Sequence, residues 1–108
     1  MTIEGEPIDD VTELVDKNGL VKLFANRVRA RVLAVLLYAD EPLTTRQIAN
    51  GAGIDRSPVV EAMEPLGRFE MIEKLNSDGR SPRYRLIEDD ELAGTIERVA
   101  TLATERYY

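Results

Sequence analysis

The sequence predicts an α+β fold, mainly α-helical, in which one β-hairpin lies between flanking helices. Apolar residues recur at spacings of three and four over most of the chain, which is the period of amphipathic helices. This period is lost over residues 71–87, where two short strand-like runs flank a turn-forming segment at 76–82. At 108 residues the chain can bury one core of ordinary domain size but not two. We therefore expect a single domain with short extensions.

The N-terminal region is expected to comprise a flexible tail, residues 1–7, and a helical extension, residues 8–26. The tail is polar and shows no period. A short helix should follow, started by two acidic residues and ended by Asn18-Gly19. Its apolar residues are Ile8, Val11, Leu14 and Val15. A second apolar stretch covers residues 20–24.

The strongest helical pattern runs from about Asn26 to Tyr38, and this helix should occupy the centre of the core. Its apolar face is formed by Val28, Val32, Val35 and Leu36. Three arginines project from its flanks, and we expect some of them to pair with acidic side chains: Arg27, Arg29 and Arg31.

A short helix over residues 46–50 is expected after the turn at 40–42. Thr44 and Thr45 precede it and supply a capping residue, because a threonine hydroxyl can accept from a free N–H in the first turn. The segment Gly51-Ala52-Gly53 should close this helix tightly.

A third helix should begin after Asp55, which is well placed to cap it, and Pro58 lies in its first turn, where a missing N–H costs nothing. Its buried side should be formed by Val59, Ala62, Met63 and Leu66. Pro65 should kink or end this helix near Glu64, because proline removes a backbone donor. A separate turn over residues 65–69 would then lead into the hairpin.

The last helix should begin at residues 89–91 and carry an apolar stripe at roughly heptad spacing. The stripe consists of Leu92, Ile96, Val99, Leu102 and Ala103. We expect residues 89–108 to pair with a second copy and form a homodimer interface, in which Tyr107 and Tyr108 could also pack. The alternative is that this helix folds back on its own core.

The composition excludes several kinds of chemistry. There is no cysteine and no histidine, which removes disulfides, thiolate and imidazole metal sites, Cys/His nucleophile pairs and histidine acid–base catalysis. The neighbouring acids Asp89 and Asp90 suit a helix start better than a catalytic pair. We therefore expect no enzymatic activity, no metal and no cofactor.

No stretch of the sequence approaches the roughly 20 apolar residues of a membrane span. Residues 1–4 also lack the basic region and apolar core of a secretory signal. We expect a cytoplasmic protein without a membrane partner.

The formal net charge of −6 opposes binding to a polyanion, but the charges are unevenly distributed. Residues 27–88 carry ten basic and nine acidic side chains, whereas both flanking segments are clearly acidic. The chain contains 11 arginines but 3 lysines against 20 acids. This acid-rich, lysine-poor balance is similar to the proteins of salt-loving archaea. An arginine-rich genome encoding an ordinary acidic protein would give the same balance.

Residues 43–63 resemble the helix-turn-helix of bacterial and archaeal transcriptional regulators. The segment that carries the resemblance is Leu43-Thr-Thr-Arg-Gln-Ile-Ala-Asn-Gly-Ala-Gly-Ile-Asp-Arg-Ser-Pro-Val-Val-Glu-Ala-Met63. Met71-Ile-Glu-Lys74 resembles the strand that enters the wing of the same domains, including those of the arsenical-repressor and multiple-antibiotic-resistance families. The resemblance extends from about Leu20 to Leu102. It implies a winged helix-turn-helix over residues 27–88, with flanking N- and C-terminal helices.

The resemblance also implies which residues face duplex DNA. In such domains one helix enters the major groove while the preceding helix and the wing hold phosphates. The groove-facing residues would be Arg56, Ser57, Val60 and Glu61. Those beside the backbone would be Thr44, Thr45, Arg46 and Gln47, although Thr44 can instead be a cap and Arg56 a surface-paired arginine. The wing would place Arg80, Arg83 and Arg85 on the backbone or in the minor groove.

Two functions remain open from the sequence. The first is a DNA-binding transcriptional regulator whose partner is double-stranded DNA. The second is a winged-helix module that docks another protein, because Val60, Glu61 and Glu64 make the third helix less polar and more acidic than the family pattern. Glu70 also stands where related domains commonly place a glycine. No residue identifies a small-molecule effector.

Overall fold

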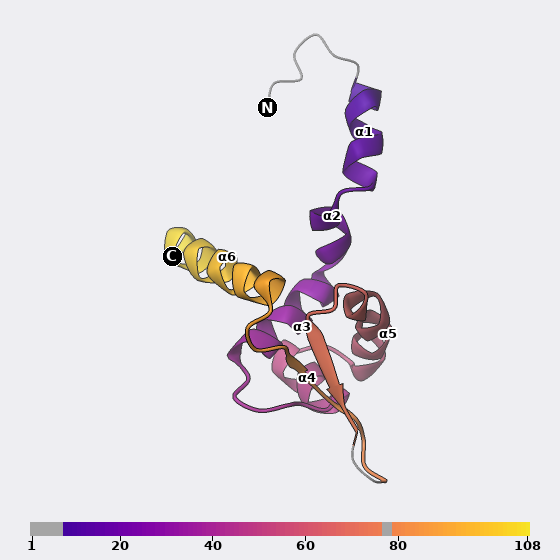
Figure 1. Cartoon of the computed structure of the whole chain (residues 1–108), viewed down its shortest axis with the longest axis vertical. Coiled ribbons are helices and arrows are strands. Elements are labelled where there is room, and N and C mark those ends of the chain that lie inside the picture. Colours follow the sequence, from indigo (N-terminus) through magenta and orange to yellow (C-terminus); the bar gives the residue numbers. More distant parts are fainter. Residues whose placement is uncertain (1–7, 77–78) are drawn as a thin grey trace.

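A computed structural model describes residues 8–76 and 79–108 and confirms a mainly helical fold with one β-hairpin (Figure 1). The expected tail, residues 1–7, and residues 77–78 of the hairpin turn lie outside the described residues. The elements follow in the order α1 (Ile8–Asp16), α2 (Gly19–Leu23), α3 (Arg27–Tyr38), α4 (Thr45–Ala52), α5 (Arg56–Gly67), β1 (Ile72–Leu75), β2 (Arg83–Leu86) and α6 (Glu91–Tyr107).

Helix α3 lies at the centre of the molecule, as its pattern predicts. The Asn26 side chain accepts a hydrogen bond from the Arg29 N–H at 3.0 Å, so the helix begins where the sequence indicates. Val32, Leu33 and Leu36 are buried. Helices α4 and α5 and strand β2 all pack against α3, and the buried side chains of these elements form one continuous core.

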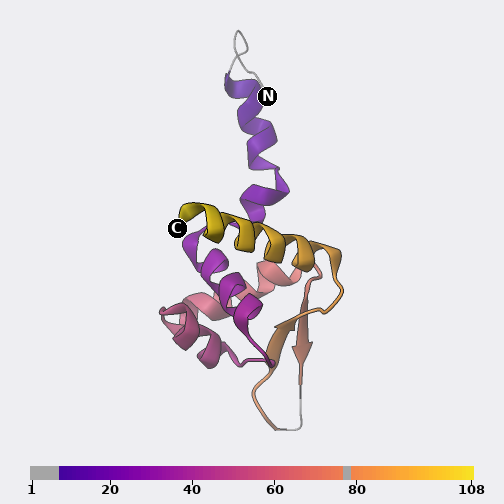
Figure 2. The same ribbon diagram turned by 90° about the vertical axis from the view of Figure 1, so that its left-hand side faces the viewer.

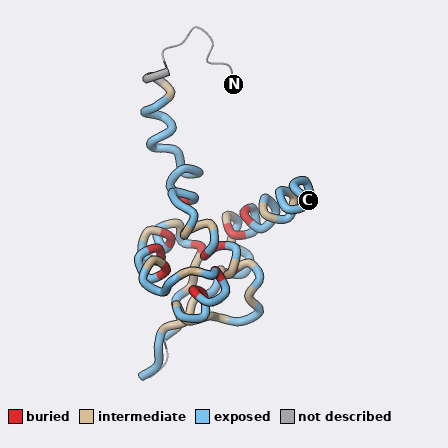
Figure 3. Tube along the Cα trace, turned by 180° about the vertical axis from the view of Figure 1, so that it is seen from behind, coloured by how far each residue is buried: buried red, intermediate tan, exposed pale blue. Residues whose placement is uncertain are grey.

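Helices α1, α2 and α6 lie at the edge of this core and project from it (Figures 1 and 2). Leu23 of α2 and Ile96 of α6 are buried, whereas Leu14 of α1 and Leu20 of α2 are 69% and 65% exposed. Figure 3 shows the same division, with buried positions near the base of α6 and exposed positions toward its end. The outer halves of these helices therefore have apolar side chains that the chain itself does not cover.

Helix α4 is longer than the sequence prediction of residues 46–50. Gly51 and Ala52 continue the helix, and the turn begins only at Gly53, whose left-handed φ of 70° suits glycine. At the start, Thr44 and Gln47 form a reciprocal capping box, in which each side chain accepts from the backbone N–H of the other. The cap predicted within residues 43–45 is thus Thr44.

Two arginines of α3 bond to the ends of other helices and not to the acidic partners that the sequence suggested. Arg31 Nε donates to the Ala52 carbonyl at the end of α4 at 2.7 Å. Arg29 Nη1 donates to the Lys22 carbonyl in the last turn of α2. A cation at a helix C-terminus interacts favourably with the helix dipole and satisfies a free carbonyl. These bonds hold α2 and α4 against α3.

The expected end of the helix near Glu64 is wrong, because α5 continues through Pro65 to Gly67. Proline removes the N–H that would bond the Glu61 carbonyl, but it leaves the other bonds of the last turn intact. Leu66 is fully buried, and the Arg68 N–H bonds back to the Pro65 carbonyl at 3.3 Å. Burial of the next residue therefore outweighs one missing bond. Asp55 does occupy the N-cap position, but within the described structure its side chain accepts no capping hydrogen bond.

The hairpin is antiparallel, with Ile72 opposite Leu86 and Leu75 opposite Arg83. Leu43 extends it as a third, one-residue strand, exchanging hydrogen bonds of 2.9 and 2.7 Å with Tyr84. Glu70, just before β1, has a φ of 59°, which is the conformation that the expected glycine would adopt without strain.

We predict that Glu70→Gly stabilises the protein by about 0.5 kcal/mol, because the removed left-handed strain of about 1 kcal/mol exceeds the added entropy of the unfolded chain. Thermal unfolding followed by circular dichroism should show a midpoint raised by a few degrees. Glu70→Ala is the control, because it removes the same charge but keeps the Cβ. If alanine stabilised as much as glycine, charge and not backbone strain would be the cause.

We also predict that Thr44→Ala lowers the free energy of unfolding by about 1 kcal/mol, because the capping hydroxyl is lost. Thr44→Ser keeps that hydroxyl and should recover most of the stability. Urea unfolding of the two variants measures the difference, and equal destabilisation by serine and alanine would refute the capping role.

Candidate nucleic-acid interface

The residues predicted to contact DNA come from α4, α5 and the hairpin. Most have exposed side chains: Arg46, Gln47, Arg56, Ser57, Val60, Glu61, Arg80 and Arg85. Thr44, Thr45 and Arg83 are partly buried. On α5 the residues that face the core are Val59, Ala62, Met63 and Leu66, so the predicted contact residues occupy the opposite, solvent-facing side of that helix.

A hydrogen bond joins the starts of α4 and α5. Arg56 Nε donates to Thr45 Oγ1 at 3.0 Å, and both residues lie in the first turn of their helices. The arginine is therefore held near α4 by a neutral hydroxyl and not by an acidic side chain in that bond. A positive charge at the start of a solvent-facing helix can bind a phosphate or a guanine edge.

A second hydrogen bond joins the hairpin to α4. Arg83 Nη1 donates to Gln47 Oε1 at 3.3 Å, and the same oxygen accepts from the Thr44 N–H at 2.9 Å. Gln47 thus belongs both to the helix cap and to the contact with β2. The structure brings together Thr44, Thr45, Gln47, Arg56 and Arg83, which the sequence predicted only as separate contact residues.

Arg85 differs from the other hairpin arginines. It lies opposite Glu73 in the sheet, and its Nε is 2.8 Å from Glu73 Oε2. This partly exposed ion pair competes with a phosphate for Arg85. Arg80 is exposed near the hairpin tip, where the chain turns between β1 and β2.

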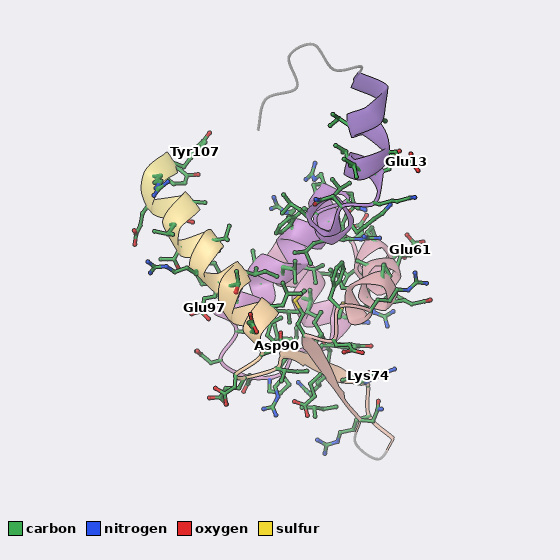
Figure 4. The ribbon with its side chains drawn as sticks, turned by 45° about the horizontal axis from the view of Figure 1, so that its top comes forward. Glu13, Glu61, Lys74, Asp90, Glu97 and Tyr107 are labelled. Atoms are coloured by element: carbon green, nitrogen blue, oxygen red, sulfur yellow. The ribbon has the colours of Figure 1, made fainter. Side chains whose placement is uncertain are left out.

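The sequence prediction omits six of the seven residues that line a groove between α5 and the hairpin. This α5–hairpin groove, about 380 Å³ in volume, is lined by Val60, Met63, Glu64, Gly67, Ile72, Lys74 and Tyr84. Of these, Lys74, Tyr84 and Glu64 have polar groups that were not assigned to the site. Lys74 and Tyr84 are directly opposite each other in the hairpin, so their side chains lie on the same face of the sheet. A prediction of this strand pairing would have identified both residues together. In Figure 4, Lys74 and Glu61 lie on one side of the molecule and Glu97 lies on the other, with Asp90 between them.

The residues predicted for a dimer interface divide into two groups. Ile96 is only 7% exposed and belongs to the core of its own chain, against which Leu92 also packs. Val99 is 54% exposed, Leu102 is partly buried and Ala103 is exposed. The second group is therefore the part of the stripe that remains accessible to another molecule.

Within residues 8–76 and 79–108, no group of three or more acidic side chains is arranged to hold a metal ion. In the same residues, every helix is too short or too polar to cross a bilayer.

Comparison by sequence finds no matching protein-family model and no matching curated protein. Comparison by structure finds solved proteins with a similar fold. The chain resembles the homodimeric winged helix-turn-helix DNA-binding domain of a possible ArsR-family transcriptional regulator from Mycobacterium bovis, with a TM-score of 0.62 and 16% identity over 95% of this chain and 91% of that one.

Two other solved structures show the same similarity. A predicted DNA-binding transcriptional regulator from E. coli has a TM-score of 0.60 and 14% identity over 89% of this chain and 95% of its own. The protein ZitR of Lactococcus lactis, in a double-mutant apo form, has a TM-score of 0.57 and 19% identity over 95% of this chain and 76% of its own. At these identities the likeness concerns the fold. The chain therefore has the winged helix-turn-helix fold, with α4 and α5 as the helix-turn-helix and the β1–β2 hairpin as the wing.

Proposed function

We propose that this chain is a DNA-binding transcriptional regulator. Helix α5 would enter the major groove, α4 would lie along the backbone, and the wing would contact the backbone or the adjacent minor groove. The observation that carries the proposal is the connection of Arg56 to Thr45 and of Arg83 to Gln47, which gathers cations from α5 and the wing around α4. The fold of solved transcriptional regulators supports the same function.

The acid-rich, lysine-poor composition supports the further proposal that the protein comes from a salt-loving archaeon and works in concentrated salt. Counterion release contributes little under such conditions, so binding measured only in dilute buffer would mislead. DNA binding should therefore be measured in both moderate and molar potassium chloride.

We predict that Arg80→Ala combined with Arg83→Ala weakens binding to a mixed pool of duplex DNA in a mobility-shift titration. The slope of log affinity against log salt should fall by about 1 for each phosphate contact removed. Arg27→Ala combined with Arg106→Ala is the control, because it removes the same charge from exposed residues outside α4, α5 and the wing. Equal losses in both variants would mean that net charge alone, and not the wing, controls binding.

We further propose that the regulator is a homodimer and that the exposed part of α6 meets a second copy. A two-fold dimer would let two recognition helices reach successive half-sites on one face of the duplex. The exposed apolar residues of α1 and α2 could complete that interface: Leu14, Val15, Leu20, Val21 and Phe24. The Mycobacterium bovis domain with the same fold is itself homodimeric.

We predict that Val99→Asp shifts the protein from dimer to monomer in sedimentation-velocity experiments, because an aspartate would be buried without a partner at the interface. Thr101→Asp is the matched control, because it introduces the same group at an exposed α6 position off the apolar stripe. A monomeric wild type, or dissociation by both variants, would contradict an interface centred on Val99.

A second candidate function is docking of a protein partner by α5. The exposed acids Glu61 and Glu64 beside the half-exposed Val60 favour it, because these acids repel phosphate. Partner binding that Val60→Asp abolishes but that survives loss of Arg80 and Arg83 would support this function. Well-folded protein that retards no duplex DNA in either salt would favour it over DNA binding.

A further inference from the structure

Val60 stands out on the exposed side of the recognition helix. It is 46% exposed, while its neighbours Arg56, Ser57, Glu61 and Glu64 on that side are polar. The buried side of α5 is already complete, with Val59 and Leu66 fully buried. Val60 therefore contributes little to the core, and its isopropyl group is available to an external ligand.

The surroundings of Val60 extend this apolar surface toward the wing. Val60 lines the α5–hairpin groove together with Met63 and Ile72, which pack into the core behind it. A Cβ built on Gly67, at the far end of the groove, would meet no atom within 4 Å, so the space there is open. The groove has one positive side chain, Lys74, which lies on β1, and one negative side chain, Glu64.

The carboxylate of Glu64 forms an ion pair outside this groove's lining residues. Its Oε1 lies 3.8 Å from Arg68 Nη2, one helical turn further along α5. This exposed ion pair partly offsets the negative charge at this end of the helix. Val60 lies one turn in the other direction, nearer to Arg56. A DNA strand that contacts Arg56 and Lys74 would therefore pass beside Val60.

We propose that Val60 reads the C5-methyl group of thymine in the major groove. This proposal rests on the proposed DNA-binding function and specifies what α5 recognises. Thymine is the base that presents an apolar group in the major groove, whereas the edges of the other bases present donors and acceptors alone. An aliphatic side chain would cover those polar groups without replacing their hydrogen bonds to water, which is unfavourable. Val60 thus favours thymine and disfavours the other bases.

The test replaces thymine by uracil, which removes the methyl group and leaves the charge and the Watson–Crick pairing unchanged. A random-sequence duplex pool is enriched for binding to the wild type and then amplified with either thymidine or deoxyuridine triphosphate. Competition between the two products measures the preference for the methyl group. Burial of one methyl group corresponds to about a four-fold preference per contacted thymine.

Three proteins are compared: the wild type, Val60→Ala and the control Ile87→Val. Ile87 is an exposed aliphatic residue just after β2, so its replacement also trims an apolar side chain, but away from α5 and from the proposed dimer interface. We expect the wild type and Ile87→Val to prefer the thymine product about four-fold or more, and Val60→Ala to bind both products about equally. Circular dichroism confirms that each variant is folded.

The outcomes separate this proposal from the one on which it depends. Equal binding of both products by the wild type would overturn methyl recognition while leaving DNA binding intact. A full thymine preference retained by Val60→Ala would overturn the assignment to Val60, because another residue would then read the methyl group. Failure of the wild type to bind either product would overturn the proposed function itself, and the assignment to Val60 with it.

Discussion

Burial of helix α3 is the constraint on which the rest of the structure depends. Val32 and Leu33 are almost completely shielded from solvent, and each such side chain contributes about 1.5–3 kcal/mol on burial. Helices α4 and α5 and strand β2 all pack against this helix. Because all three elements pack against α3, this helix fixes their positions relative to one another. The hydrogen bond from Arg31 to the end of α4 also fixes the orientation of α4 on α3.

The polar bonds on the proposed DNA-binding surface serve another purpose. The bonds from Arg56 to Thr45 and from Arg83 to Gln47 involve mainly exposed atoms, so each contributes at most about 1 kcal/mol to folding. Bonds of this strength orient the arginines but can be exchanged for bonds to phosphate at little cost. The core holds the backbone in place, and the surface bonds limit the conformations that each arginine must lose on binding.

The sequence was sufficient to predict the features that depend on neighbouring residues. The order of the elements and the start of α3 near Asn26 follow from local spacing and side-chain chemistry. The expected end of α5 near Glu64 was wrong because a local rule cannot weigh one lost bond against the burial of Leu66. The contact between Arg83 and Gln47 spans 36 positions, so it exists only once the fold brings the wing to α4.

The groove beside Val60 was missed for a related reason, since Met63 and Ile72 come from different elements and each looks like an ordinary core residue in the sequence. This groove bears on how an acidic protein can recognise DNA. Ion pairs with phosphate weaken as salt rises, because exposed charges are screened within about 3 Å at 1 M. An apolar contact with a methyl group is not screened, and excluded salts strengthen apolar burial. For a chain with a net charge of −6 and two acids on α5, the proposed contact through Val60 would therefore be a source of base preference that concentrated salt does not remove.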